Sequence, residues 1–96
     1  MPIKGVTELE ESIVKSILTP YLDRYEFYFY GSRVKGNFRE LSDLDILLKY
    51  KSNLDLNDIE DLKQAFDESK LPYVVNLSYD VDEKFYKLIE KDLVKI

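Results

Sequence analysis

The sequence predicts an α+β fold, an α/β sandwich whose elements follow the order α-β-β-α-β-α. Apolar residues recur at helical spacing in three segments of the chain, which indicates amphipathic helices. Three short runs rich in aromatic and branched residues alternate with the polar segments, as buried strands do. The chain length of 96 residues is enough for one hydrophobic core, so we expect a single domain over residues 1–96.

The first predicted element is an amphipathic helix. Thr7 followed three residues later by Glu10 is typical of a capping box at a helix N-terminus. Helical spacing of apolar residues then continues until the break at Pro20. The residues that we expect on the buried face are Leu9, Ile13, Val14, Ile17 and Leu18.

Two predicted strands follow, separated by a polar segment. A nearly continuous aromatic run over residues 26–30 favours a buried strand that ends at Gly31. Residues 31–42 are basic and polar, which predicts a short loop or helix. The apolar residues resume at Leu44, and we expect the second strand to end at Lys49.

The second half of the chain predicts a helix, a strand and a further helix. Asn57 with Glu60 offers a second capping signature, and residues 73–79 predict the third strand. Asp82 can cap the last helix, and residues 93–96 add a short terminal extension. The residues that we expect on the inner faces of these two helices are Ile59, Leu62, Ala65, Phe66, Phe85, Leu88 and Ile89.

The composition excludes several kinds of site. The formal net charge is −5, and the chain has no cysteine and no histidine. Thiol nucleophiles, imidazole bases, disulfides and the usual zinc ligands are therefore excluded, and carboxylates remain as ligands for a hard cation such as Mg²⁺. A negative surface argues against the binding of bulk nucleic acid. Because no long apolar span is present, we expect a cytoplasmic protein without membrane contact.

Asp43 and Asp45 are the first candidates for chemistry. They lie two residues apart inside the second predicted strand, so both side chains should leave the same face, roughly 6.5–7 Å apart. Carboxylates so placed repel each other unless a cation lies between them and bridges them to phosphates. An Asp-x-Asp pair taken alone is more often a solvated edge or a helix cap, and that alternative stays open at this point.

Gly31 and Ser32 form the second candidate pair. Glycine lets a backbone approach another group closely, and Ser32 supplies a hydroxyl and an amide that can bind phosphate oxygens. A Gly-Ser pair after a strand is most often a turn. The glycine–serine pair and the aspartate pair are more specific together than either is alone, because they form one pattern that predicted strands flank on both sides.

The combined pattern resembles the signature of the DNA polymerase β-like nucleotidyltransferase superfamily. Gly31-Ser32 is followed by ten intervening residues and then by Asp43-Leu44-Asp45. Within that superfamily the chain is most similar to the minimal nucleotidyltransferases, the antitoxin partners of HEPN-domain toxins. The similar segments include residues 31–36, 42–46 and 71–77, so the resemblance covers nearly the whole chain.

The resemblance implies a nucleotidyltransferase fold, in which a short mixed β-sheet is flanked by helices. It also implies that Ser32 lies near the terminal phosphates of ATP and that Asp43 and Asp45 hold Mg²⁺. The implied reaction transfers AMP to a hydroxyl, expected to be that of a tyrosine, on a partner protein. The implied partner is a HEPN-type helical toxin, or another small protein encoded nearby, which the transfer neutralises.

The resemblance places a third catalytic carboxylate at the position of Asn76. An amide keeps an oxygen that can contact a metal or water, but it lacks the charge and basicity of a general base. Three functions therefore remain open. The chain could be a Mg-dependent transferase, an antitoxin that binds nucleotide and inhibits its partner by binding alone, or the catalytic subunit of a split small-molecule nucleotidyltransferase.

Three basic residues, Arg33, Lys35 and Arg39, lie between the two halves of the motif. Their charges could meet the triphosphate or an acidic partner, and the alternative is that they are solvated surface residues. Of the three, we expect Lys35 and Arg39 to be the better nucleotide ligands. Asp82 is assigned to helix capping rather than to catalysis.

Overall fold

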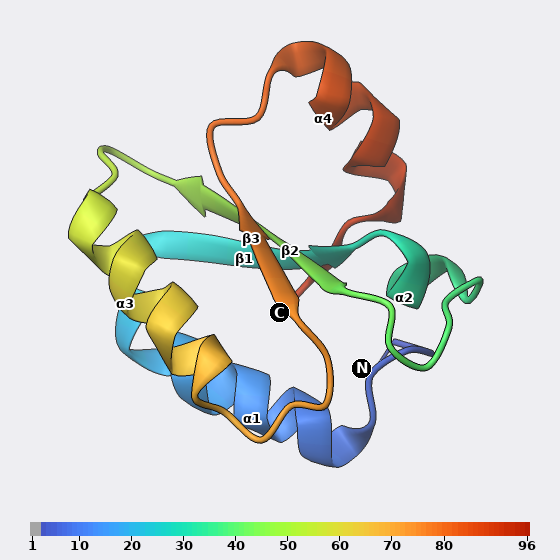
Figure 1. Cartoon of the computed structure of the whole chain (residues 1–96). Coiled ribbons are helices and arrows are strands. Elements are labelled where there is room, and N and C mark those ends of the chain that lie inside the picture. The colour runs from blue at the N-terminus through green and yellow to red at the C-terminus, as the bar shows by residue number, and fades with distance from the viewer. Residues whose placement is uncertain (1–2) are drawn as a thin grey trace.

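The computed structural model describes residues 3–96 and confirms the α+β class, with a mixed sheet of four strands flanked by helices (Figure 1). Met1 and Pro2, which the predicted domain includes, lie outside the described residues. The elements in chain order are α1 (Glu8–Leu18), the 3₁₀ helix η1 (Thr19–Tyr21), β1 (Tyr25–Tyr30), α2 (Ser32–Lys35), β2 (Leu44–Tyr50), α3 (Leu56–Asp67), β3 (Val75–Ser78), α4 (Glu83–Ile89), the 3₁₀ helix η2 (Glu90–Asp92) and β4 (Val94–Lys95).

The predicted elements are all present, and the structure adds four short ones, namely η1, α2, η2 and β4. α2 lies in the polar segment for which we expected a loop or a helix, and β4 lies in the terminal extension. β2 begins at Leu44, so Asp43 immediately precedes the strand. The prediction that Asp43 lies inside this strand was therefore wrong. The reason is a turn, in which the Ser42 N–H donates to the Arg39 carbonyl at 3.0 Å just before Asp43.

The sheet has the strand order β3-β2-β1-β4. β1 is antiparallel to β2 and β4, whereas β2 and β3 are parallel, so the sheet is mixed. The register aligns Tyr30, Asp45 and Asn76 across three neighbouring strands. Partners in a ladder project from the same face of a sheet. We call these three residues the site row.

The face of the sheet opposite the site row carries the main core. Phe27, Phe29 and Ile46 are almost fully buried there, and α1 and α3 cover this face together (Figure 1). α4 lies on the other side of the sheet, where Ile89 packs in a smaller cluster with Leu47 and Tyr30 of the site row. The face that carries the site row is therefore only partly covered.

Side chains cap the helices at their N-termini. The Thr7 hydroxyl accepts from the Glu10 N–H and the Glu10 carboxylate accepts from the Thr7 N–H, which confirms the capping box. Asp82 caps α4 as predicted. The cap of α3 is Asp55 rather than Asn57, whose own backbone N–H is the donor to Asp55. Among residues 3–96, none of the helices is both long enough and apolar enough to cross a bilayer.

Three residues predicted on buried helix faces lie at the surface. The exposed fractions are 73% for Leu9, 65% for Leu88 and 37% for Phe85. Periodicity shows which residues share a helix face, but the neighbouring elements decide how much of that face is covered. α4 has only seven residues and buries Ile89 alone, so most of its apolar side chains remain accessible.

We predict that Phe27→Ala lowers the free energy of unfolding by about 3–5 kcal/mol, because it leaves a cavity in the main core. Phe85→Ala is the matched control, since it removes the same ring from a position that is 37% exposed, and it should cost roughly 1 kcal/mol or less. Urea denaturation followed by circular dichroism measures both. Equal losses would contradict this placement of the core.

Candidate functional site

The site is built where three strands and one loop meet. Asp45 is the second residue of β2, and its side chain lies on the face away from the main core, in register with Tyr30 and Asn76. Asp43 lies two residues earlier, on the loop that leads into the strand. Strand alternation therefore places both carboxylates on one face, as the sequence predicts.

Asn76 joins the two carboxylates. Its Nδ2 amide donates to Asp43 Oδ2 at 2.8 Å and to Asp45 Oδ1 at 3.3 Å. The oxygens of Asp43 and Asp45 thus converge on a single nitrogen, which carries partial positive charge. This partial charge reduces the mutual repulsion of the two carboxylates.

The environment of Asp45 disfavours its charge. Burial raises the pKa of the Asp45 carboxyl above its ordinary value of 3.8, the hydrogen bond from Asn76 lowers it, and the neighbouring charge of Asp43 raises it again. The net direction is upward. A half-buried carboxylate with a raised pKa is typical of a functional site and gains most from a positive ligand.

Gly31 is required for the position of Asp45. Its φ of 86° and ψ of −159° lie in a region that is accessible essentially only to glycine. A Cβ atom at this position would collide with the Asp45 carboxylate, whose Cγ would lie 3.2 Å away. The absence of a side chain therefore lets the chain turn from β1 into α2 directly against the carboxylate.

Ser32 begins α2 immediately beside this turn. The Gly31 carbonyl accepts from the N–H groups of Val34 and Lys35, whereas the first amides of any helix have no partner within it. A hydroxyl and a backbone amide are therefore available next to Asp45. α2 has only four residues, so local hydrogen bonds rather than a helix dipole would bind an anion here.

The Arg33 side chain is buried and bonded to the backbone rather than exposed to a ligand. It is 4% exposed, and its guanidinium donates to the carbonyls of Gly5, Ser42 and Glu40 at 2.6, 2.9 and 2.8 Å. It also lies 3.9 Å from the centre of the Tyr73 ring. The guanidinium thus ties the loop that precedes β2 to the N-terminal segment, and the structure does not favour Arg33 as a phosphate ligand.

Lys35 and Arg39, the other basic candidates, do not enter the site either. The Lys35 ammonium pairs with Asp92 at 3.6 Å, and its side chain is half exposed. Arg39 is exposed on the loop, where its backbone N–H donates to the Ser42 hydroxyl at 2.8 Å. Only a rearrangement of these long side chains would bring their charges to a bound phosphate.

A cavity of about 460 Å³ adjoins the site row, which is large enough for a small ligand or part of a larger one. Sequence reasoning missed several of its residues. Ser78 could have been found, because it lies two residues after Asn76 on the same face, but Lys63 and Asp67 come from α3 and leave no signal in a strand pattern. The lining residues are Tyr30, Asp45, Lys63, Asp67, Val75, Asn76, Leu77 and Ser78.

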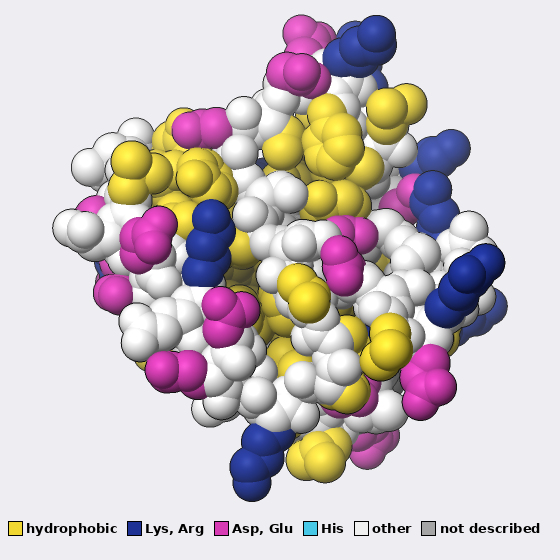
Figure 2. All heavy atoms as spheres, viewed as in Figure 1, with side chains coloured by type: hydrophobic (Ala, Val, Ile, Leu, Met, Phe, Trp, Pro, Cys, Tyr) yellow, Lys and Arg dark blue, Asp and Glu magenta, His cyan; other side chains and the backbone are white. Residues whose placement is uncertain are grey.

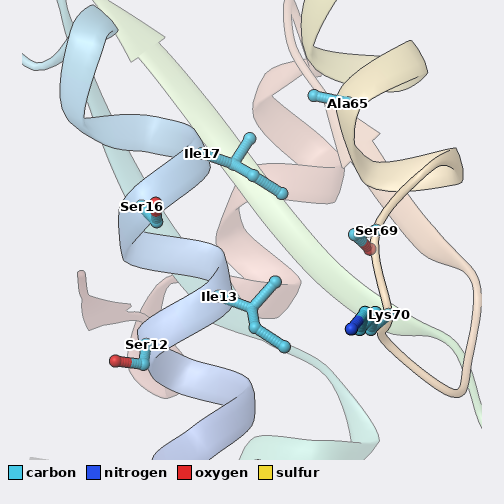
Figure 3. A pocket seen from close by; sticks show the side chains of 7 residues that line it. All are labelled: Ser12, Ile13, Ser16, Ile17, Ala65, Ser69 and Lys70. Carbon is cyan, nitrogen blue, oxygen red and sulfur yellow. The ribbon is translucent and has the colours of Figure 1, made fainter.

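A second cavity, of about 470 Å³, lies on the far side of the sheet between α1 and α3. Ile13 and Ile17 of α1 point into it toward Ala65 of α3 (Figure 3). Its lining contains serines and one lysine but no carboxylate or other base that could activate them. We therefore assign the chemistry to the cavity at the site row.

The side chains at the site row fit a hard divalent cation. The carboxylates of Asp43 and Asp45 are oxygen donors of the type that Mg²⁺ prefers, and Asn76 has a carbonyl oxygen that could join them if the amide turned over, since Nδ2 faces the carboxylates in this structure. Within residues 3–96 no group of three or more acidic, histidine or cysteine side chains converges, because Asn76 stands beside the two aspartates. An acidic patch lies near the centre of the face seen in Figure 2. A cation here would draw its remaining ligands from water and phosphate.

Comparisons with known proteins identify the family. Residues 13–95 match the family model described as polymerase beta, nucleotidyltransferase. A relative from Haemophilus influenzae, named probable protein adenylyltransferase MntA, is 39% identical over 89 residues, which cover 91% of this chain and 78% of the relative. A crystal structure from Sulfolobus solfataricus, described as that of an inferred nucleotidyltransferase, superposes with a TM-score of 0.54 at 22% identity. The match covers 92% of this chain and 76% of the Sulfolobus chain. The last likeness concerns the fold alone.

We predict that Gly31→Ala displaces the Asp45 carboxylate and weakens the binding of Mn²⁺, used as a probe for Mg²⁺, by at least tenfold. Gly36→Ala is the matched control. Gly36 also has a positive φ, of 92°, but its Cβ would meet only the flexible end of the Lys4 side chain. Both changes should destabilise the fold by about 1 kcal/mol or more. Water-proton relaxation measures the binding, and equal Mn²⁺ affinities of the two variants would contradict the role of Gly31.

We further predict that Asp45→Asn stabilises the metal-free protein in a pH-dependent way. Because the pKa of Asp45 is raised, the folded state binds more protons than the unfolded chain at pH values just above 3.8, and stability falls as the pH rises through this window. The gain in unfolding free energy from Asp45→Asn should therefore grow from about pH 4 upward and then level off. Urea denaturation in chelator measures this gain. A gain that does not change with pH would contradict the raised pKa.

Proposed function

Because the chain belongs to the polymerase beta nucleotidyltransferase family, we propose that it binds Mg-ATP at the site row and transfers AMP to a hydroxyl of a partner protein. The observation that carries this proposal is the convergence of the Asp43 and Asp45 oxygens on one point. Beside that point, the absence of a side chain at Gly31 lets the Asp45 carboxylate lie against the turn that leads to Ser32. The proposed partner is a small helical toxin of the HEPN type encoded nearby, and the modification neutralises it.

The proposed transfer exchanges one phosphorus–oxygen bond for another. The acceptor oxygen bonds to the α-phosphorus, the bond from this phosphorus to the bridging oxygen breaks, pyrophosphate leaves, and the hydroxyl proton passes to water. Bound Mg²⁺ supplies the positive charge that offsets the charge of the triphosphate. Asp43 and Asp45 hold this cation, and Ser32 binds the terminal phosphates through its hydroxyl and its amide. These residues act by positioning and by charge.

Asn76 sets the expected rate. To serve as a ligand of a cation held by Asp43 and Asp45, Asn76 would have to present its carbonyl oxygen rather than Nδ2. The amide cannot take the proton of the acceptor hydroxyl, and the absence of a placed general base typically costs about 10²- to 10⁴-fold in rate. We therefore expect slow transfer by the chain as it stands.

ATP as the nucleotide and a protein as the acceptor are supported by the relative from Haemophilus influenzae, which is named a protein adenylyltransferase. The relative is 39% identical and covers most of this chain, so its printed activity is the best guide to this one. A tyrosine acceptor rests on the resemblance to the minimal nucleotidyltransferases. The small-molecule alternative has no comparable support.

A second candidate function is inhibition by binding alone. The specific observation in its favour is that Asn76 satisfies Asp43 and Asp45 internally, so the site is balanced without a cation. In this case the chain covers its partner, with or without bound nucleotide, and transfers nothing. The two candidates share the same partner and differ only in chemistry.

We predict that the chain, incubated with α-labelled ATP, Mg²⁺ and the purified protein encoded beside it, transfers label slowly to that protein. Asn76→Asp should raise the rate by about 10- to 10³-fold, because it restores a carboxylate that can accept the proton. Asp43→Ala/Asp45→Ala should abolish transfer. The matched control Asp23→Ala/Asp61→Ala removes the same charge from exposed positions and should leave transfer unchanged.

The outcomes separate the candidates. If only Asn76→Asp transfers label, the chain is an inhibitor by binding and its chemistry is latent. If neither form transfers label and calorimetry detects no binding of Mg-ATP, the proposed nucleotide site is wrong. Label that persists in the double alanine variant would show that the chemistry lies elsewhere.

A further inference from the structure

β3 is an edge strand whose outer side is open. It is the last strand in the order β3-β2-β1-β4, and it pairs only with β2 among the strands of residues 3–96. Figure 1 views the sheet from the side of β3, and no other described element crosses in front of this strand. An open strand edge presents backbone donors and acceptors that can pair with another chain.

The direction of the free backbone groups follows from one hydrogen bond. The Val74 carbonyl accepts from the Leu44 N–H at 2.9 Å, so the backbone groups of Val74 point toward β2. Backbone groups alternate in direction along a strand. Those of Asn76 therefore also point toward β2, whereas those of Val75 and Leu77 point to the outer edge.

The cavity beside the site row extends around this edge. Its lining includes Val75 and Leu77, whose side chains pack on the main core, as well as Asn76 and Ser78 on the opposite face of β3. A cavity that touches both faces of a strand must run past its outer edge. Lys63 and Asp67 of α3 also line this cavity, so a groove rather than a flat surface borders the outer edge of β3.

The same edge passes directly beside the proposed reaction. Asn76 is in register with Asp45, one strand spacing of about 4.8 Å away. A strand added outside β3 would lie one spacing, about 4.8 Å, beyond β3 and so two spacings from Asp45. Its side chains would alternate between the two faces of the sheet, so every second one would lie over Asn76.

We propose that the acceptor protein docks as an extended segment along the outer edge of β3 and places its hydroxyl side chain over Asn76. This inference rests on the proposed transfer, because only a transferase has an acceptor hydroxyl and a KM for it. The backbone of the segment pairs with Val75 and Leu77. Only tyrosine, the longest of the hydroxyl side chains, reaches across Asn76 to a phosphate held at Asp43 and Asp45.

The opposite edge of the sheet does not offer the same surface. β4 contains only Val94 and Lys95, and it is in register with Tyr28 and Phe29 of β1, not with Asp45. A segment added outside β4 would lie farther from Asp45 than a segment added outside β3. β4 therefore provides the control position for a test of edge docking.

The test compares two proline variants at outward-facing positions. Val75→Pro removes one outward N–H of β3 while leaving the β2 ladder intact, and proline is tolerated on edge strands. Lys95→Pro does the same on β4, because the Ile96 N–H donates inward to Phe27. With the neighbouring-gene protein as acceptor, we expect Val75→Pro to raise KM for that protein at least tenfold, and by a larger factor than it changes KM for Mg-ATP. Lys95→Pro should change neither quantity.

Hydrogen exchange on the unmodified chain provides the second measurement. We expect the Val75 and Leu77 amides to exchange rapidly in the free chain and at least tenfold more slowly in the complex. The Asn76 amide should be protected in both states. A complex that forms while the Val75 and Leu77 amides stay unprotected, or an unchanged KM for Val75→Pro, overturns edge docking but leaves the proposed function standing. If no complex forms, the proposed function fails and edge docking fails with it.

Discussion

The carboxylate of Asp45 is half-buried, and the residues around it are placed so that they accommodate its charge. Gly31 has no side chain, which leaves space for the carboxylate where β1 turns into α2. Asn76 donates to Asp45 and to Asp43 from the neighbouring strand. Each of these contacts depends on the register of β1, β2 and β3, which the large core on the opposite face of the sheet maintains. The packing of the main core therefore offsets a local electrostatic cost, which a bound cation would relieve.

Arg33 stabilises the approach to this position from the other direction. A buried guanidinium is costly unless its donors are satisfied, and here backbone carbonyls and aromatic rings provide the partners. The Gly5 N–H donates in return to the Arg33 carbonyl at 3.0 Å, so the N-terminal segment and α2 are joined in both directions. Asp43 follows this anchored loop. The guanidinium of Arg33 therefore helps to position Asp43 beside Asp45, although its hydrogen bonds go to backbone carbonyls and not to either carboxylate.

The sequence predicted the architecture well because periodicity and capping are local. Asp43 and Asp45 do lie close together as their spacing predicted, although Asp43 precedes the strand, and Thr7 and Asp82 correctly marked two helix starts. Sequence reasoning could not show that Arg33 is buried, since its partners come from distant segments. Lys63 reaches the cavity for a similar reason, because only the packing of α3 beside β3 brings it there. The spacing of the apolar residues in α4 did not reveal that no neighbouring element covers most of its apolar face.

The pairing of Asp45 with Asn76 also has a genetic consequence. Asparagine and aspartate codons differ by a single base, so one point mutation separates an internally balanced site from one in which Asp43, Asp45 and residue 76 together carry three negative charges. The residues around position 76 need not change, because the two side chains have the same shape and the ladder between β2 and β3 is made by the backbone. A lineage with this fold can therefore gain or lose demand for a cation in one mutational step while its core remains untouched.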